Sequence, residues 1–309
     1  GYKTHAHYVI EERMAKDPRQ VSTFLARMHK RLRKKGLPER DRLLALKRAE
    51  NPQASRLESW DFAYYHNELK KKDYELDDEK IKEYFPMEKV TGEMLRIYQE
   101  LLGVTFRPVE PAEAWHPEVK RFEVSDAKTG ARIGHFYMDL YPREGKYKHA
   151  AAFNLIGGRK EPDGSYREPV SAIVANFNKP GQDRPSLLKH GEVETYFHEF
   201  GHIMHQVLTR AAIPRFGGTR VARDFVEAPS QIFENWVWEP EVLTRISGHY
   251  QTGAPLPKDL LERMIAAKNL DSGLTYLFQV FLNSVDQEFH DSDLEDTTLT
   301  RRRLYSDIT

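Results

Sequence analysis

The sequence predicts a mainly α fold of the α+β class, in which a small antiparallel β-sheet directly precedes a central helix. Three observations predict it. Apolar residues recur at helical spacing over residues 1–103, alternate with polar residues over 104–180, and return to helical spacing over 181–309. The 309 residues contain no Ser/Gly linker, repeat or low-complexity tract. We therefore interpret the chain as one continuous region with three consecutive stretches.

The first stretch is helical from Tyr2 to Leu102, and proline or glycine is expected to break it at four places. The expected breaks are at Pro18, 36–38, 51–52 and Pro86. A basic run at 30–35 would suit nucleic acid. It lies, however, on a helix whose apolar residues keep core spacing, so a solvated helix face is the favoured interpretation.

The second stretch carries the predicted strands. Strand-like segments occur at 122–125, 133–138, 151–156 and 170–177. Because short turns join strands that follow one another, we expect antiparallel pairing. The segment 174–177 is our expected sheet edge, where Ala175, Asn176 and Phe177 would bind a peptide that adds itself as a strand. An ordinary internal strand is an equally weighted alternative.

The third stretch contains the pentapeptide His198-Glu199-Phe200-Gly201-His202. Two histidines four positions apart on a helix lie on one face, where both imidazoles reach the same metal ion. The glutamate between them then lies beside the metal, placed to take a proton from a water molecule. This spacing indicates a zinc hydrolase, with Glu199 as the candidate base.

The residues around the pentapeptide support a helix with two distinct faces. Apolar residues follow helical spacing on the side away from the two histidines, which leaves the other side free for chemistry. They are Val193, Tyr196, Phe197, Phe200, Ile203, Met204, Val207 and Leu208. The helix is expected to begin within 186–191 and to end before Pro214.

A hydrolytic zinc site needs a third protein ligand and an open position. Glu227 is the best candidate, because it begins a second predicted helix and the segment 210–223 is long enough to reverse the chain. The alternative is a helix N-terminal carboxylate favoured by the macrodipole, and the two roles are compatible. We expect His205 to pack or to support a ligand, and consider Ser230 and Glu194 as partners of the ligand histidines.

Two segments resemble the thimet oligopeptidase family of zinc metallopeptidases, which includes neurolysin, saccharolysin and the bacterial dipeptidyl carboxypeptidases. They are LLKHGEVETYFHEFGHIMH at 187–205 and DFVEAPSQ at 224–231. The likeness extends to WDFAYY at 60–65, YFP at 84–86, FYMDLYPREGKY at 136–147 and SGHYQTG at 247–253. The resemblance implies a helical zincin-type catalytic region. It also implies one Zn²⁺ ion held by His198, His202 and Glu227, with Glu199 as general base.

The resemblance further implies that residues 1–309 are an interior piece of a longer enzyme. Family members carry a loop of the form HxxGYxxGYYGY, which is expected after Thr309 and supplies Tyr and His donors to the substrate oxyanion. Two hypotheses follow. The first is a zinc-dependent metallopeptidase that hydrolyses short oligopeptides, either as an endopeptidase or by removing dipeptides. The alternative is a catalytically silent zinc- or peptide-binding fragment. His249 and Tyr250 are expected to be surface or packing residues.

Composition narrows the class of partner. Lys and Arg together number 47, as do Asp and Glu, so no overall charge favours nucleic acid or a membrane surface. The chain has no cysteine, which excludes disulfides and thiolate metal sites. No apolar run approaches a membrane span. We expect short peptides as partners, a monomer, and a cytoplasmic location, or a mitochondrial one if a targeting segment precedes the chain.

Overall fold

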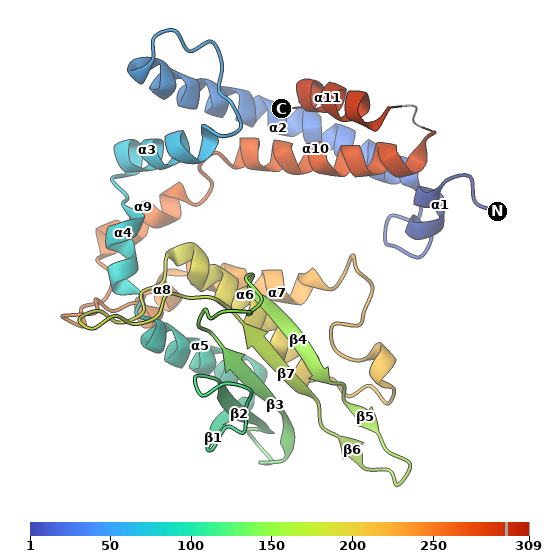
Figure 1. Cartoon of the computed structure of the whole chain (residues 1–309), viewed down its shortest axis with the longest axis vertical. Coiled ribbons are helices and arrows are strands. Elements are labelled where there is room, and N and C mark those ends of the chain that lie inside the picture. The colour runs from blue at the N-terminus through green and yellow to red at the C-terminus, as the bar shows by residue number, and fades with distance from the viewer. Residues whose placement is uncertain (294–295, 309) are drawn as a thin grey trace. The chain divides into compact units, whose positions relative to one another are not determined.

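The computed structural model describes residues 1–293 and 296–308, so Thr309 lies outside the described part. The chain forms two compact units (Figure 1). One contains residues 1–76 and 263–309, and the other contains residues 77–262. This division does not follow the three stretches of the sequence. The second unit is inserted between helical segments, and one boundary falls inside helix α9 (Lys258–Ala267), so no linker composition marks it.

The regular secondary structure of the first unit is all helical in its described part. It contains α1 (His5–Ile10), α2 (Pro18–Glu50), α3 (Phe62–Tyr74), α10 (Ser272–Asp291) and α11 (Thr297–Ile308). One buried apolar cluster joins α2, α10 and α11, and a second joins α2 to α3. The members of the first are Leu25, Leu277, Val280, Phe281, Leu304 and Ile308.

The expected helix break at 36–38 is wrong, because α2 continues through it. Gly36 lies against Gly273 of α10, where an added Cβ would be 3.2 Å from the Gly273 carbonyl carbon. In the next turn, the Glu39 carboxylate accepts a hydrogen bond from the backbone N–H of Leu274. Close packing of two helix backbones therefore outweighs the local preference of Gly and Pro to end a helix.

The second unit combines short helices with a small sheet. Its helices are α4 (Asp78–Ile81), η1 (Lys82–Tyr84), α5 (Met87–Leu102), α6 (His190–Val207), η2 (Pro214–Phe216), α7 (Glu227–Glu234), η3 (Asn235–Trp238) and α8 (Pro240–Ile246). The main sheet has the order β1 (Val104–Val109), β2 (Lys120–Asp126), β3 (Arg132–Asp139), β7 (Val170–Val174) and β4 (Ala151–Ile156). A hairpin of β5 (Arg159–Lys160) and β6 (Tyr166–Arg167) extends from it (Figure 1).

The sheet is mixed, so the expectation of purely antiparallel pairing is wrong. β7 pairs parallel to β3 and antiparallel to β4. After β3 the chain crosses to the position of β4 and only then returns as β7 between them. β3 and β4, which follow one another along the chain, are therefore not neighbours in the sheet. Sequence alternation predicts strands but carries no information about this insertion.

The expected edge at 174–177 is also wrong. The N–H groups of Ala175 and Phe177 donate to the carbonyls of Asp139 and Leu140, and both side chains are buried. Asn176 donates from Nδ2 to the carbonyl of Tyr147. Within the described sheet the strand on this side that pairs with only one neighbour is β4. Backbone donors available to an added strand therefore lie on β4.

The apolar face of α6 packs against the sheet, as its periodicity predicts. Phe200 lies edge-on to Phe136 of β3 and Phe106 of β1, with ring centroids 5.2 and 5.7 Å apart. Tyr98 of α5 donates its hydroxyl to the carbonyl of Phe197 at 2.7 Å. Seven of the eight predicted stripe residues are buried: Val193, Tyr196, Phe197, Phe200, Ile203, Met204 and Val207. This packing determines which face of α6 is left for chemistry.

A buried ionic cluster holds the ends of β3 and β7 together. The Asp139 carboxylate accepts hydrogen bonds from Arg143, Lys146 and Trp115. Burial alone would raise the pKa of Asp139, but these donors outweigh it and hold that pKa well below its usual range. Lys146 also donates to the carbonyls of Asp139, Tyr141 and Ala175. One ammonium group thus contacts three backbone carbonyls and one carboxylate.

We expect Lys146→Met to lower the free energy of unfolding by about 3–5 kcal/mol, the range for breaking a buried ion pair by removing one partner. The Lys146 side chain is 3% exposed, so water cannot replace its bonds without opening the cluster. Denaturant titration of the wild-type chain and the variant measures the difference. Lys148→Met, at an exposed position, is the matched control. Equal stability of both variants would contradict the assigned role.

Candidate metal centre

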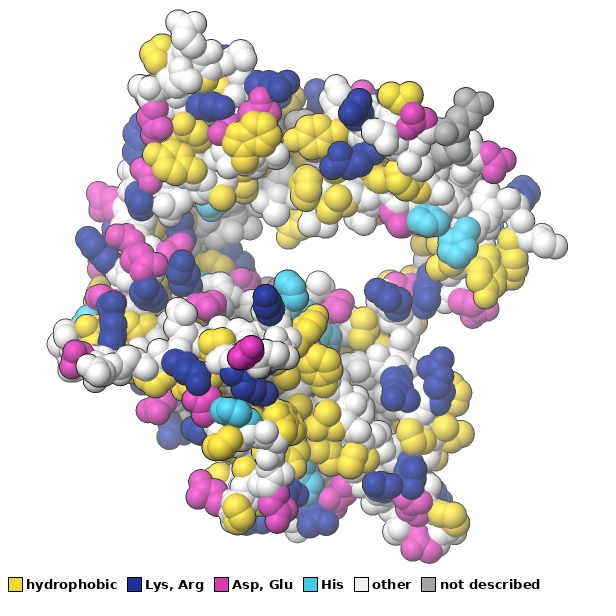
Figure 2. Space-filling model, in the orientation of Figure 1, with side chains coloured by type: hydrophobic (Ala, Val, Ile, Leu, Met, Phe, Trp, Pro, Cys, Tyr) yellow, Lys and Arg dark blue, Asp and Glu magenta, His cyan; other side chains and the backbone are white. Residues whose placement is uncertain are grey.

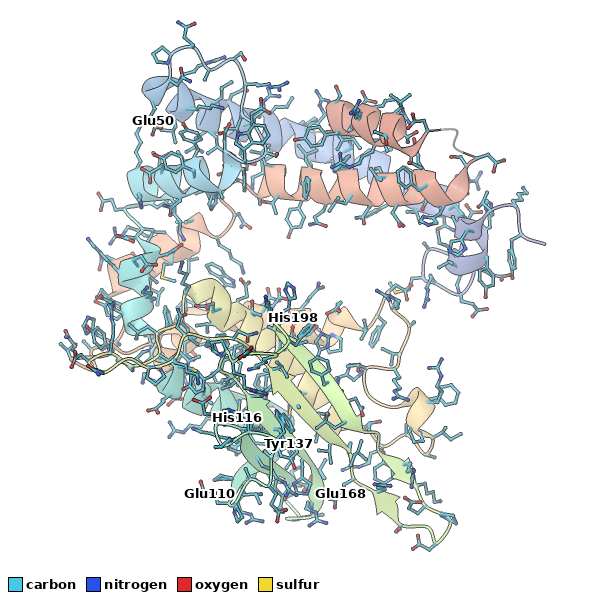
Figure 3. All side chains as sticks on the ribbon, in the orientation of Figure 1. Glu50, Glu110, His116, Tyr137, Glu168 and His198 are labelled. Atoms are coloured by element: carbon cyan, nitrogen blue, oxygen red, sulfur yellow. The ribbon has the colours of Figure 1, made fainter. Side chains whose placement is uncertain are left out.

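Helix α6 brings the two pentapeptide histidines to one face. The rings of His198 and His202 lie with centroids 4.8 Å apart, and His198 is marked on α6 in Figure 3. Glu227 begins α7, as predicted, and its Oε2 lies 3.2 Å from Nε2 of His198 and 3.0 Å from Nε2 of His202. Among the described residues, this is the one group of three ligand-type side chains close enough to hold a metal ion.

The segment between the two helices is held back against α6, which returns Glu227 to the histidines. Gln206 donates from Nε2 to the hydroxyl of Thr219 at 3.2 Å. Gly218 has a φ of +59°, and an added Cβ there would lie 2.8 Å from the Cα of Gln206. The position needs glycine both for its backbone conformation and for this close approach. The predicted chain reversal is therefore produced by specific contacts of 217–219.

Glycine within the pentapeptide allows α6 and α7 to touch. An added Cβ at Gly201 would lie 2.9 Å from the Cα of Ser230 and 3.3 Å from Cδ2 of Phe233. Ser230 is fully buried and donates its hydroxyl to the carbonyl and carboxylate of Glu227, at 2.9 and 3.1 Å. Ser230 thus supports Glu227, whereas we had considered it as a partner of the histidines. Glu194, the other candidate partner, accepts instead from the indole of Trp238.

Sequence reasoning missed Glu234, whose Oε1 lies 2.6 Å from Nδ1 of His198. A carboxylate bonded to the second nitrogen of a ligand histidine holds the ring orientation and leaves the other nitrogen to face the metal. The signal was present in the sequence. Glu234 follows Glu227 by seven residues, about two helical turns, so both carboxylates lie on one side of α7.

We expect Glu234→Gln to weaken zinc binding by about 10–100-fold, the usual cost of losing a partner of a metal ligand. Glutamine keeps the volume and offers a neutral amide to His198 in place of a carboxylate. Competition with a chromophoric chelator measures the affinity. Glu241→Gln, in the first turn of α8, removes a carboxylate from another helix and should leave the affinity unchanged.

Glu199 points toward the edge strand. Burial, reinforced by the nearby charge of Glu227, raises the pKa of its carboxyl group, although His198 and the backbone N–H of Ala152 in β4 oppose the shift. The influence of the Ala152 backbone on this pKa places the carboxylate beside β4. The group therefore lies between the histidine cluster and the strand edge, at a position where a base could act on a bound peptide.

The remaining histidines of this region do not join the cluster. His205 lies outside the three-residue group, and burial lowers its pKa. His249 stacks on Tyr250 and lies 3.6 Å from the Glu83 carboxylate, which makes it a packing and surface residue as expected. Burial likewise lowers the pKa of His202, against the opposing charge of Glu227. A neutral imidazole is the form that binds a metal.

The donor set fits zinc. Two imidazole nitrogens and one carboxylate oxygen are the ligands that catalytic zinc takes in proteins, with a further position left for water. The three donor atoms lie within 4.8 Å of one another, which a single ion can bridge. Thiolate alternatives are excluded because the chain has no cysteine.

Comparison with known proteins agrees with this geometry. The family model described as peptidase family M3 matches residues 1–308. The chain belongs to this family. It is 44% identical to thimet-like oligopeptidase of Dictyostelium discoideum, which it matches over 100% of its own length and 48% of the relative. It is 40% identical to oligopeptidase A of Escherichia coli, over 94% of this chain and 42% of the relative.

Other relatives broaden the family comparison. Saccharolysin of Saccharomyces cerevisiae is 36% identical, over 100% of this chain and 45% of the relative. The mitochondrial intermediate peptidase of Arabidopsis thaliana is also 36% identical, over 93% of this chain and 41% of the relative. The chain thus spans somewhat less than half the length of these relatives. The predicted resemblance to the thimet oligopeptidase family is confirmed. In the described part, no helix is both long and apolar enough to cross a membrane.

Proposed function

We propose that this M3 family member is a zinc-dependent metallopeptidase that hydrolyses peptide bonds in short oligopeptides. The observation that carries the proposal is the convergence of His198, His202 and Glu227 beside the Glu199 carboxylate. These three side chains would hold one Zn²⁺ ion. When bound, the ion supplies a Lewis acid for the scissile carbonyl and lowers the pKa of a water molecule toward neutrality.

Glu199 is the residue that we assign to proton transfer. It accepts a proton from the attacking water and delivers it to the departing amine nitrogen. Two features of its surroundings support this role. Burial raises its pKa, which makes the protonated form easier to reach, and the carboxylate lies beside Ala152 of the edge strand β4. The family relatives that are named as oligopeptidases support the same class of substrate.

The free edge of β4 is our proposed binding surface for the peptide backbone. β4 pairs with β7 on one side and with no other strand of the described sheet, and its residue Ala152 lies beside Glu199. An extended peptide added to this side would bind through main-chain hydrogen bonds, which give affinity with little sequence preference. The bound peptide would also lie beside the Glu199 carboxylate. This assignment replaces Ala175, Asn176 and Phe177 as the backbone-binding residues.

Removal and return of the metal tests the proposed function. We expect about one zinc per chain by elemental analysis, loss of cleavage of a quenched fluorescent peptide after chelation, and recovery on adding zinc. A chain that binds zinc but never cleaves above the Glu199→Gln background would instead support the silent zinc- or peptide-binding alternative. A chain without zinc affinity would contradict both. For location we infer the cytoplasm, or the mitochondrion that the names of some relatives indicate.

A further inference from the structure

β4 is followed directly by β5, and we call these two consecutive strands the β4–β5 ribbon. Different groups lie beside the two ends of this ribbon. At the first, Ala152 lies beside the Glu199 carboxylate. At the second, the N–H of Lys160 points away from its partner strand β6 and donates to the carbonyl of Ala212 at 3.0 Å. The ribbon thus meets the candidate base near one end and the segment 209–216 at the other.

Segment 209–216 closes the second end of this ribbon. The hydroxyl of Tyr166 donates to the carbonyls of Thr209 and Ala211, at 3.3 and 3.2 Å. Pro214 lies directly against Gly157, where an added Cβ would be 3.0 Å from the Cβ of Pro214. These contacts attach the segment to the hairpin as one body. A peptide lying along β4 would therefore run end-on into residues 212–215.

The length of the open edge determines which part of a peptide reaches this barrier. From Ala152 to Ile156 the chain advances four residues, about 13 Å at the rise of a β-strand. A peptide whose scissile bond lies beside Glu199 would place a residue about four positions away against segment 212–215. This distance holds for either direction of the bound peptide.

Positive charge collects at the barrier. We define the basic ledge as the cations without an ion-pair partner in the hairpin and in residues 209–220. They are Lys160, Arg167, Arg210, Arg215 and Arg220. All five are exposed, and none forms an ion pair with a described residue. Arg210 lies over the ring of Tyr166, with its guanidinium carbon 5.7 Å from the centroid. In Figure 2 Lys and Arg side chains are visible over this part of the second unit, with hydrophobic and acidic side chains among them.

Two of the three carboxylates of the hairpin are paired with arginines outside the ledge, whereas Asp163 keeps its negative charge, so the ledge stays positive mainly through the arginines of 209–220. Glu161 pairs with Arg159, and Asp163 accepts from the backbone and hydroxyl of Ser165. Elsewhere in this unit exposed arginines do have partners, as Arg132 has Glu168. Uncompensated cations at the end of a binding edge raise the local concentration of anionic ligands. Guanidinium groups match a carboxylate in geometry as well as in charge.

We propose that the basic ledge binds a carboxylate of the substrate peptide about four residues from the scissile bond. The carboxylate belongs to an Asp or Glu side chain or to a free C-terminus. The proposal rests on the proposed function, because it uses the same β4 edge and the same position of the cleaved bond. It assigns to this peptidase a preference for acidic oligopeptides, although the chain as a whole has no net charge.

Matched peptides test this proposal by binding. Labelled peptides that differ by one Gln-to-Glu change, placed two to six residues from the cleaved bond on either side, are titrated against zinc-loaded Glu199→Gln chain by fluorescence anisotropy. We expect a three- to tenfold lower Kd for Glu at about four residues, and a smaller gain in high salt. Peptides with free and amidated C-termini separate the two sources of the carboxylate.

Two double variants locate the effect. Arg215→Glu/Arg220→Glu should abolish or reverse the preference for Glu. Lys120→Glu/Lys128→Glu makes the same charge change on β2 and the β2–β3 turn and should retain it. If Glu and Gln peptides bind with equal Kd and wild type cleaves both, the role of the basic ledge is wrong but the proposed function stands. Failure of every peptide to bind and to be cleaved would overturn the proposed function itself.

Discussion

Glu199→Gln is expected to reduce peptide hydrolysis by about 10²–10⁴-fold, the contribution of general acid–base catalysis, and to leave zinc affinity unchanged. Glu199 is absent from the group of three close ligand-type side chains, so its replacement removes no metal donor. Glutamine preserves the size of the side chain, but its amide cannot accept a proton from water. Catalysis and metal binding are thereby separated at one position.

Comparison with Glu234→Gln makes this result specific. Glu234 contacts a proposed ligand, so its loss should weaken zinc binding but permit cleavage when zinc is in excess. Glu199→Gln should show the opposite behaviour, with full zinc occupancy and little cleavage. Steady-state cleavage and zinc titration of both variants give a cleavage rate and a zinc affinity for each. If Glu199→Gln keeps more than about a tenth of the wild-type rate, Glu199 is not the base.

Gly201→Ala is expected to lower the free energy of unfolding by about 1–3 kcal/mol and to weaken zinc binding by about 10–100-fold. The new methyl group would lie 2.9 Å from the Cα of Ser230, which is backbone and cannot rotate away. Helix α7 must therefore shift, and Ser230 and Glu227 shift with it. Alanine favours a helix by about 1 kcal/mol relative to glycine, which is too little to offset the overpacking.

Gly191→Ala is the matched control for this prediction. Gly191 lies in the first turn of the same helix, and an added Cβ there would meet nothing within 4 Å. This variant should bind zinc normally and be as stable as wild type or up to about 1 kcal/mol more stable. Chemical denaturation and chelator competition apply to both variants. Normal zinc affinity in Gly201→Ala would show that the contact between α6 and α7 does not position Glu227.

Local patterns made much of the site predictable from the chain alone. The spacing of His198 and His202 is a property of one helix, and so is the apolar stripe that turns both histidines away from the sheet. Glu227 was predicted to begin a second helix, and α7 begins there. These predictions succeed because each depends on residues within a few turns of one another.

Contacts between distant segments decided the rest. The insertion of β7 between β3 and β4, and with it the identity of the free edge, depends on a crossover that strand periodicity does not encode. α2 continues through 36–38 because α10 packs against Gly36. The contact of Glu234 with His198 required both the periodicity of α7 and its distance from α6. The sequence by itself therefore determined the residues capable of chemistry, because helical spacing is local. Only the tertiary structure decided which carboxylate supports which histidine and where a peptide can lie, because those depend on backbone approach across long loops.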